Sequence, residues 1–314
     1  MNPALRVVFA GTPEFAAQSL RALLNAGYRP SLVLTQPDRP AGRGRKLTPS
    51  PVKVAALEAG VDVLQPKTLR DTEAQARIAA EQCDFLIVAA YGLILPQAVL
   101  ELPRIAPLNV HASLLPRWRG AAPIQHSILN GDAQTGISLM RMEAGLDTGP
   151  VYATAALTIG ATESSGQLHD RLAELGGRLL VNELAGIANG ATRAVDQPVD
   201  GVTYAGKMAK TDASVDWHDD ATTIDRVVRA YNPWPVAYTQ IDGKPLRIFR
   251  ATVLTASDVS AEPGVVVATG SDGIDVACKR GALRLLEVQL AGKRRIAAAD
   301  FARQRALLGT QLGD

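Results

Sequence analysis

Asparagine and histidine stand two residues apart, at Asn109 and His111, in the stretch from Pro107 to Pro116. Their apolar neighbours Leu108 and Val110 predict that this stretch extends a β-strand. Because side chains on a strand repeat their direction every second residue, the amide and the imidazole would lie side by side. An amide can donate to a carbonyl oxygen that becomes anionic, and an imidazole can carry a proton near neutral pH. The pair is typical of acyl transfer, although a single histidine at a strand end is more often structural.

A carboxylate that could complete this pair is Asp147, in a loop flanked by Gly145 and Gly149. A carboxylate beside an imidazole fixes the tautomer of the ring and stabilises its protonated form. Asn109, His111 and Asp147 together therefore predict a site that stabilises an oxyanion and moves a proton. The sequence alone does not show that the three side chains meet in space.

Two other kinds of site are disfavoured by spacing. The turn Gly11–Phe15, which follows the first expected strand, lacks the second and third glycines of a dinucleotide-binding turn. It can still line a pocket, because ligands bind at the carboxyl ends of parallel strands. Histidines and cysteines are not clustered at the spacing of metal ligands, so we expect no metal site. The remaining histidines are expected to be structural or at the surface: His126, His169 and His218.

The run from Asn109 to Gln125, NVHASLLPRWRGAAPIQ, resembles the signature of the 10-formyltetrahydrofolate-dependent formyltransferases. The segment around Asp147, the run Phe9–Phe15 and the loop Thr35–Gly44 resemble the same family, and the likeness extends over nearly the whole chain. The resemblance implies that the catalytic residues are Asn109, His111 and Asp147. Carried over residue by residue, it implies folate-binding positions at Ser113, Leu114, Leu115, Pro116, Ala89, Ala90, Tyr91, Gly92, Leu93, Met140, Arg141, Met142 and Glu143.

The resemblance also implies a reaction. The family transfers a formyl group from 10-formyltetrahydrofolate, used as a cosubstrate without a metal, to an amine. The acceptor implied for this chain is the free amino group of initiator methionyl-tRNA, which gives N-formylmethionyl-tRNA for translation initiation. Three alternatives stay open: formylation of a small amine such as a nucleotide sugar or glycinamide ribotide, hydrolysis of the formyl-folate, and a non-catalytic RNA-binding module.

The loop Thr35–Pro51 distinguishes a tRNA acceptor from a small amine. It is long for a connection in an α/β domain, and it interleaves cations with glycine and proline. We expect it to order against the acceptor stem of tRNA, with phosphates neutralised by its cations; the alternative is a solvated surface loop. A second patch lies near the C-terminus, where the alternative is a cluster that only aids solubility. The expected tRNA-binding residues of the two patches are Arg39, Arg43, Arg45, Lys46, Lys293, Arg294 and Arg295.

Strand, turn, helix and strand alternate through the first part of the chain, which predicts an α/β domain with a parallel, Rossmann-like sheet. We expect this catalytic domain to span residues 1–190. Its expected strands are 5–10, 31–34, 61–64 and 84–89, and its expected helices are 14–25, 52–59 and 71–81.

Residues 191–206 are polar and rich in turn residues, so we expect a linker there. A helix at 221–230 and short alternating runs predict a small β-barrel domain at 207–314. The resemblance implies a barrel of the oligonucleotide-binding (OB-like) type that binds tRNA. The expected strands are 236–241, 246–253, 264–269, 274–278 and 282–290.

The bulk composition narrows the class of protein. The 314 residues are 47% hydrophobic, with no apolar run long enough to cross a membrane. A net charge of +2 argues against indiscriminate nucleic-acid binding, so any RNA must be bound by local patches. The two cysteines, Cys83 and Cys278, are expected to be reduced thiols. With no secretory signal recognised at the N-terminus, we expect a cytoplasmic protein, and we expect it to be a monomer.

Overall fold

The computed structural model describes residues 5–41, 44, 46–254 and 261–313 of the chain. The chain divides into two compact units, and each is described by itself. Unit 1 comprises Met1–Pro123, Gln134–Leu157 and His169–Ala205. Unit 2 comprises Ile124–Ala133, Thr158–Leu168 and Gly206–Asp314.

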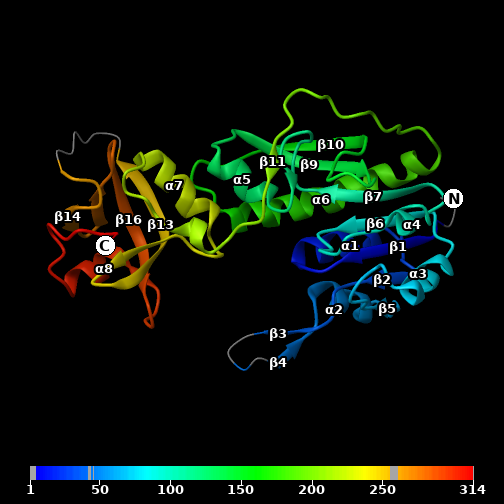
Figure 1. Ribbon diagram of the computed structural model, residues 1–314, viewed down its shortest axis with the longest axis horizontal. Coiled ribbons are helices and arrows are strands. Elements are labelled where there is room, and N and C mark those ends of the chain that lie inside the picture. Colours follow the sequence, from blue (N-terminus) through cyan, green and yellow to red (C-terminus); the bar gives the residue numbers. More distant parts are fainter. Residues whose placement is uncertain (1–4, 42–43, 45, 255–260, 314) are drawn as a thin grey trace. The chain divides into compact units, whose positions relative to one another are not determined.

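Unit 1 is built on a seven-stranded sheet in the order β10-β9-β7-β6-β1-β2-β5 (Figure 1). The five strands from β7 to β5 pair in parallel, and β9 runs antiparallel to β7. The predicted parallel α/β fold of the N-terminal region is therefore confirmed. The strands are β1 (Val7–Gly11), β2 (Leu32–Leu34), β5 (Val63–Leu64), β6 (Phe85–Ala89), β7 (Ala106–His111), β9 (Gln134–Arg141) and β10 (Val151–Thr158).

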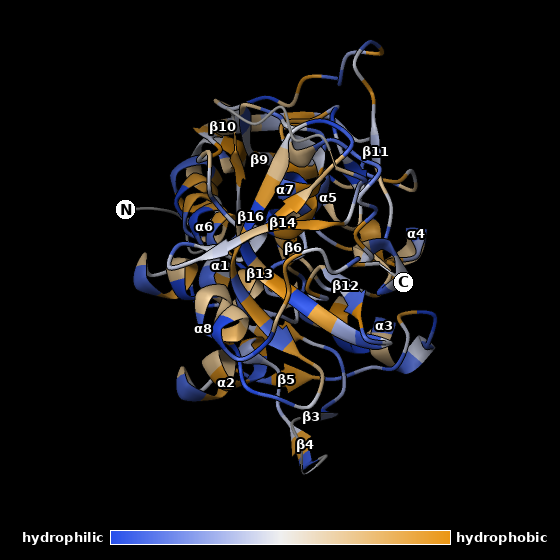
Figure 2. Ribbon diagram, turned by 90° about the vertical axis from the view of Figure 1, so that its left-hand side faces the viewer, coloured by the Kyte–Doolittle hydropathy of each residue, from blue (hydrophilic) through white to orange (hydrophobic). Residues whose placement is uncertain are grey.

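All residues of the central strands β1, β2 and β6 are buried. One cluster joins Val8 and Leu86 of the sheet to Ile78 and Val99 on two helices. Hydrophobic residues accordingly gather along the strands (Figure 2). The helices of this part of the chain are α1 (Glu14–Asn25), α2 (Pro51–Glu58), α3 (Thr72–Ala79), α4 (Gln97–Leu100) and α6 (Ser165–Ala188).

Helix α6, to which the sequence analysis assigned no element, contains two consecutive glycines. A Cβ at Gly176 would meet Val110 of β7 at 2.9 Å, and one at Gly177 would meet Ala22 of α1 at 2.9 Å. Glycine disfavours a helix interior, which is why the pattern was not recognised. Here the missing Cβ atoms let α6 pack closely on the strand that carries Asn109 and His111.

The loop Thr35–Pro51 is more regular than expected. It contains a two-stranded hairpin of β3 (Arg39–Ala41) and β4 (Lys46–Thr48), which are antiparallel and extend away from the large sheet (Figure 1). The described residues of β4 are exposed. The loop therefore presents its cations on a protruding arm of unit 1.

Residues 191–205, which were expected to lie in a linker, belong to unit 1. Val195 forms an isolated bridge with Val151 of β10. Strand β11 (Tyr204–Ala205) pairs in parallel with β8 (Arg119–Gly120). Turn-rich composition indicated a linker, but hydrogen bonds to distant strands hold this stretch in the first unit.

Unit 2 contains an antiparallel sheet in the order β12-β13-β16-β15-β14, with β17 paired to β16. Its core joins the sheet to helices α7 and α8, and the buried Trp217 indole donates to Thr239 Oγ1 at 2.9 Å. The prediction of a second, small β domain is confirmed. Its elements are α5 (Pro123–Leu129), η1 (Thr211–Ala213), α7 (Ala221–Ala230), β12 (Tyr238–Ile241), β13 (Lys244–Leu254), β14 (Val266–Gly270), β15 (Gly273–Ala277), β16 (Ala282–Leu290), β17 (Ile296–Ala297) and α8 (Ala298–Arg303).

Candidate active site

Asn109 and His111 occupy the carboxyl end of β7, a central strand of the large sheet. Asn109 lies between Val88 of β6 and Met140 of β9 in the strand register. Asn109 is half-buried, and the His111 side chain is 6% exposed. The expected strand therefore places both side chains at the end of the sheet where ligands of parallel α/β folds bind.

Asp147 approaches both residues from the loop that follows β9. Its Oδ2 lies 3.7 Å from His111 Nδ1, and its Oδ1 lies 3.4 Å from Asn109 Nδ2. The backbone N–H of Gly120 donates to Asp147 Oδ2 at 2.8 Å. The structure thus brings together the three side chains that the sequence singled out, and the carboxylate is the point at which they meet.

The imidazole of His111 has a defined tautomer. Its Nε2 lies 3.0 Å from the carbonyl oxygen of Trp118, and a carbonyl can only accept a hydrogen bond. Nε2 must therefore carry a proton and donate it. The atom left to gain or lose a proton is Nδ1, which faces Asp147. A proton on Nδ1 would point at the carboxylate, whereas a neutral ring would set its lone pair against it.

The backbone groups of Trp118 and Gly120 had no assigned role in the sequence analysis. Both residues lie within the run Asn109–Gln125, but the resemblance implied roles for other residues of this run. Every residue has a carbonyl and an amide, so residue type gives no signal for such a role. Trp118 N also donates to Thr203 Oγ1 at 2.9 Å, which ties this segment to residues 191–205.

The first expected folate-binding segment, Ser113–Pro116, forms a turn held by serines. Ser113 is buried, and its hydroxyl donates to Arg117 O at 2.6 Å. Ser138 Oγ donates to Ser113 O at 2.7 Å and accepts from Leu115 N at 3.0 Å. The hydroxyl of Ser113 therefore shapes the turn, and the half-buried side chains of Leu114, Leu115 and Pro116 present its surface.

In the second expected folate-binding segment, Ala89–Leu93, the side chains of Ala89 and Tyr91 are buried. The carbonyl of Tyr91 accepts from Thr12 Oγ1 and from Gln36 Nε2, both at 2.9 Å. The Tyr91 hydroxyl has no hydrogen-bond partner among the described residues, and burial raises its pKa above the usual range. Ala90 and Gly92 have positive φ angles, which marks this segment as a sharp turn after β6.

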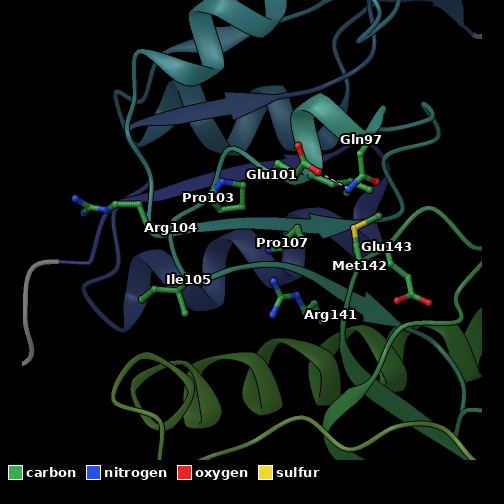
Figure 3. A pocket seen from close by; sticks show the side chains of 10 residues that line it. Gln97, Glu101, Pro103, Arg104, Ile105, Pro107, Arg141, Met142 and Glu143 are labelled. Atoms are coloured by element: carbon green, nitrogen blue, oxygen red, sulfur yellow. Dashed lines mark hydrogen bonds between the residues drawn. The ribbon is translucent and has the colours of Figure 1, made fainter.

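The third expected folate-binding segment, Met140–Glu143, borders a cavity of about 360 Å³ (Figure 3). Met142 N donates to Pro107 O at 2.8 Å, and Arg141 pairs with Leu108, the neighbour of Asn109. The cavity therefore lies beside Pro107, near the start of β7, and its lining does not include Asn109, His111 or Asp147. Its lining combines apolar and charged side chains: Gln97, Leu100, Glu101, Pro103, Arg104, Ile105, Pro107, Arg141, Met142 and Glu143.

Of the expected tRNA-binding residues on the arm, Arg39 and Lys46 lie on the hairpin, while Arg43 and Arg45 lie outside the described residues. Lys46 is exposed. Arg39 Nη2 donates to Gln36 Oε1 at 2.6 Å. Arg39 is therefore tied to the base of the arm, and Lys46 is the described cation on β4.

The base of the arm is held by a polar network. Lys53 Nζ donates to Asp38 Oδ2 at 2.7 Å, and Gln65 Nε2 donates to Asp38 Oδ1 at 2.8 Å. These two donors hold the pKa of Asp38 below its ordinary value. Gln65 Nε2 also donates to Gln36 O at 2.9 Å. Because the same Gln36 contacts Tyr91, the arm is anchored beside an expected folate-binding segment.

The three expected tRNA-binding cations of unit 2, Lys293, Arg294 and Arg295, are all exposed but differ in their contacts. Arg295 pairs with Glu287 and stacks over the Phe249 ring, 4.2 Å from its centroid. Lys293 and Arg294 border a cavity of about 410 Å³. The first two cations are therefore better placed to meet phosphates than the third.

Among the described residues, no group of three or more histidine, cysteine, aspartate or glutamate side chains is placed to hold a metal ion. Both cysteines are free and buried. Burial raises the pKa of Cys83 to about 11 and that of Cys278 to about 12. Among the described residues, no helix is long and apolar enough to cross a membrane.

Sequence comparison matches both parts of the chain to one family. The formyl transferase model matches residues 5–184, and the model of the formyl transferase C-terminal domain matches residues 207–306. A methionyl-tRNA formyltransferase of Methylococcus capsulatus is 52% identical over 309 residues, which are 98% of this chain and 100% of that protein. One of Aromatoleum aromaticum is 53% identical over 95% of this chain and 94% of that protein.

Solved structures share the fold at low identity. WlaRD, a sugar 3N-formyl transferase solved with dTDP and 5-N-formyl-THF, is 15% identical, with a TM-score of 0.67 over 93% of this chain and 100% of that chain. HypX from Aquifex aeolicus, solved with tetrahydrofolic acid, is 17% identical, with a TM-score of 0.63 over 96% of this chain and 47% of that chain. The two family models and the relatives about 50% identical show that the chain belongs to the formyl transferase family, among the methionyl-tRNA formyltransferases.

Proposed function

We propose that this chain transfers a formyl group from 10-formyltetrahydrofolate to the free amino group of initiator methionyl-tRNA. The observation that carries the proposal is the meeting of Asn109, His111 and Asp147 at the carboxyl end of the sheet. Relatives about 50% identical over nearly the whole chain, described as methionyl-tRNA formyltransferases, support the choice of acceptor. The product would be N-formylmethionyl-tRNA for translation initiation.

Asn109 is proposed to stabilise the charge that develops on the formyl oxygen. Its Nδ2 donates weakly to Asp147 at 3.4 Å, so the amide can turn toward a stronger acceptor. One such donor at an oxyanion contributes about 3 to 4 kcal/mol. A neutral formyl oxygen accepts this hydrogen bond more weakly than the oxyanion does, and this difference lowers the barrier of the reaction.

The amine attacks the formyl carbon, and the bond from that carbon to folate N10 then breaks. His111 and Asp147 are proposed to move the proton of the attacking amine to N10, which leaves as a neutral amine. A free α-amine has a pKa of roughly 7.7 to 8.0, so a fraction is neutral at pH 7 and little help is needed. Nδ1 of His111 faces the Asp147 carboxylate at 3.7 Å, so the two groups can exchange a proton once this contact shortens in the substrate complex. The hydrogen bond from Nε2 to Trp118 keeps the ring in place during this exchange.

For the cosubstrate, we propose a folate site formed by Ala89–Leu93, Ser113–Pro116 and Met140–Glu143. The last of these segments borders the cavity of about 360 Å³, a volume within the usual range of small-molecule pockets. The apolar side chains would contact a flat ring, and backbone groups would donate and accept at its edge. Bound folate supplies the formyl group.

For the acceptor, we propose that phosphates of the tRNA contact the arm and the C-terminal patch. The arm contributes Arg39, Arg43, Arg45 and Lys46, and the patch contributes Lys293, Arg294 and Arg295. Exposed cations on a protruding hairpin support this assignment. A low net charge of +2 makes such local patches necessary.

We also propose that the enzyme is cytoplasmic, works as a monomer and needs no metal. Sedimentation of the free protein and of its tRNA complex tests the monomer. Activity after exhaustive chelation tests the metal-free reaction, because a metal-dependent enzyme would stop.

The direct test uses labelled 10-formyltetrahydrofolate with four acceptors: initiator methionyl-tRNA, uncharged tRNA, free methionine and a nucleotide amino sugar. We expect label on methionyl-tRNA alone. Label on the sugar alone would assign the chain to small amines. Formate released without any acceptor would indicate hydrolysis, and no reaction with bound RNA would indicate a non-catalytic module.

A further inference from the structure

Gln197 lies in the stretch 185–206, between the ranges matched by the two family models. Its side-chain oxygen accepts from Arg119 Nε at 3.1 Å and from Arg119 Nη2 at 2.8 Å. Its side-chain nitrogen donates to Asp147 O and to Gly149 O, both at 2.8 Å. The amide therefore links a signature arginine to the loop that carries Asp147.

The orientation of this amide is fixed by its partners. A guanidinium can only donate and a carbonyl can only accept, so the reversed amide would face donors with its NH₂ group and acceptors with its oxygen. Both protons of Nε2 are used, one for each carbonyl. The side-chain amide of Gln197 therefore makes all four of its hydrogen bonds, and only one orientation of the amide allows this.

The backbone that Gln197 holds is unusual. Asp147 has φ +51°, a left-handed backbone conformation that residues other than glycine rarely adopt. At Gly149 a Cβ would run into the carbonyl of Arg141 at the end of β9. Hydrogen bonds from other parts of the chain are therefore needed to stabilise this backbone conformation. Gln197 provides two of them, to the carbonyls of Asp147 and Gly149.

Arg119 and Gly120 hold Asp147 in two ways. The N–H of Gly120 donates to the Asp147 carboxylate at 2.8 Å, while the side chain of Arg119 holds Gln197. Both residues form β8, which pairs with β11 in the stretch that also carries Gln197. Strand β8 therefore positions the carboxylate of Asp147 directly, through Gly120, and its backbone indirectly, through Arg119 and Gln197.

We propose that Gln197 is a positioning residue, through which Arg119 acts, that sets the backbone of Asp147 so that its carboxylate faces His111 and Asn109. The inference rests on the proposed function and adds a residue outside the matched signature. A misplacement of about 1 Å in such a group costs up to about 10²-fold in rate. Loss of Gln197 should therefore lower kcat while the binding surfaces stay intact.

The test compares Gln197→Ala and Gln197→Glu with Gln134→Ala, which removes an exposed glutamine from the start of β9. Gln197→Glu keeps the contact to Arg119 but presents an oxygen to two carbonyls. We expect both Gln197 variants to lose about 10- to 100-fold in kcat, with KM for both substrates changed less than about 3-fold. Gln134→Ala should match the wild type.

Arg119 supplies a second arm of the test. If it acts through Gln197, the double variant Arg119→Ala/Gln197→Ala should be no slower than the slower single variant, because the effects of one unit do not add. Additive losses would show that Arg119 acts independently and would overturn that part of the proposal. Unchanged kcat in both Gln197 variants, or a loss confined to KM for tRNA, would overturn the whole.

An NMR spectrum of the histidine rings separates this proposal from the proposed function. The chain has four histidines, so the His111 ring can be assigned by substitution. We expect Gln197→Ala to shift the His111 resonances and Gln134→Ala to leave them unchanged, whether or not formyl is transferred. Unshifted His111 resonances in a folded Gln197→Ala protein would refute the positioning role. Absence of formyl transfer by the wild type would refute only the proposed function.

Discussion

The polar end of β7 and the cationic turn of unit 2 use charged groups in opposite ways. The carboxylate and the carbonyl of Asp147 have directed partners, and the His111 ring is fixed by a backbone carbonyl. In the turn Lys293–Arg295, the side chains are exposed, and Arg295 forms an ion pair with Glu287. Chemistry depends on angles and distances, whereas phosphate binding depends on the number of available charges. Substitutions should therefore act on kcat at the first region and on salt-dependent binding at the second.

The largest effect is expected for His111→Ala. Removing the ring removes the proton carrier and the contact to Trp118, so kcat should fall by about 10²- to 10⁴-fold. KM for methionyl-tRNA should change little, because the tRNA contacts are proposed elsewhere. Steady-state kinetics with both substrates checks this, and a variant with full turnover would remove His111 from the mechanism.

Asn109→Ala should follow, with a loss of about 10²- to 10³-fold in kcat. The amide is proposed to act on the transition state, so folate affinity measured by titration should stay close to that of the wild type. An unchanged kcat with weaker folate binding would instead make Asn109 a binding residue.

Arg43→Ala tests the arm. Its side chain is expected to meet tRNA phosphates, so KM for methionyl-tRNA should rise severalfold while KM for the folate stays nearly constant. Paired titrations of both substrates measure the two constants. Equal losses for the two ligands would take the arm out of the tRNA site.

Arg294→Ala and Arg295→Ala form a matched pair within the turn. In a plot of the logarithm of the binding constant against the logarithm of the salt concentration, Arg294→Ala should reduce the magnitude of the slope by about 1, as expected for one lost phosphate contact. Arg295→Ala should change it less, because this cation already pairs with Glu287. Filter binding to methionyl-tRNA across a salt series measures the slope for each variant. Equal slopes would show that the ion pair with Glu287 does not keep Arg295 from contacting phosphate.

The smallest effect concerns the thiols. Burial raises the pKa of Cys83 to about 11 and of Cys278 to about 12 from an ordinary 9.0, so the folded state keeps protons that the unfolded state loses. Stability should therefore be fully present below pH 9 and decline as pH rises above it. Denaturant unfolding at pH 8 and pH 10 measures the decline. A Cys83→Ala/Cys278→Ala variant should show a shallower decline, and an identical decline would assign the effect to other groups.

The sequence predicted which three side chains meet around Asp147, because their signals are local. The alternation of apolar residues around Asn109 and His111 indicated a strand, and glycines on both sides marked the loop of Asp147. Helix α1, at Glu14–Asn25, and helix α7, at Ala221–Ala230, have the predicted bounds. Family resemblance added the folate and tRNA assignments, which stay predictions.

The sequence did not predict features that depend on distant partners. Gln197 lies in a polar, turn-rich stretch, and only its contacts with Arg119 and the Asp147 loop separate it from a linker residue. The carbonyl of Trp118 orients His111, but its residue type carries no such information. The basic loop forms a hairpin whose base is held by Gln65, well outside the loop itself.

Asp147 is proposed to hold Asn109 in place and to move the amine proton together with His111. Asp147→Asn keeps the shape of this side chain but removes its charge. With folate and methionyl-tRNA both saturating, we expect the single-turnover rate of formyl transfer to fall by about 10²- to 10⁴-fold while both ligands stay bound. A single-turnover rate within about twofold of the wild type would refute this role of Asp147.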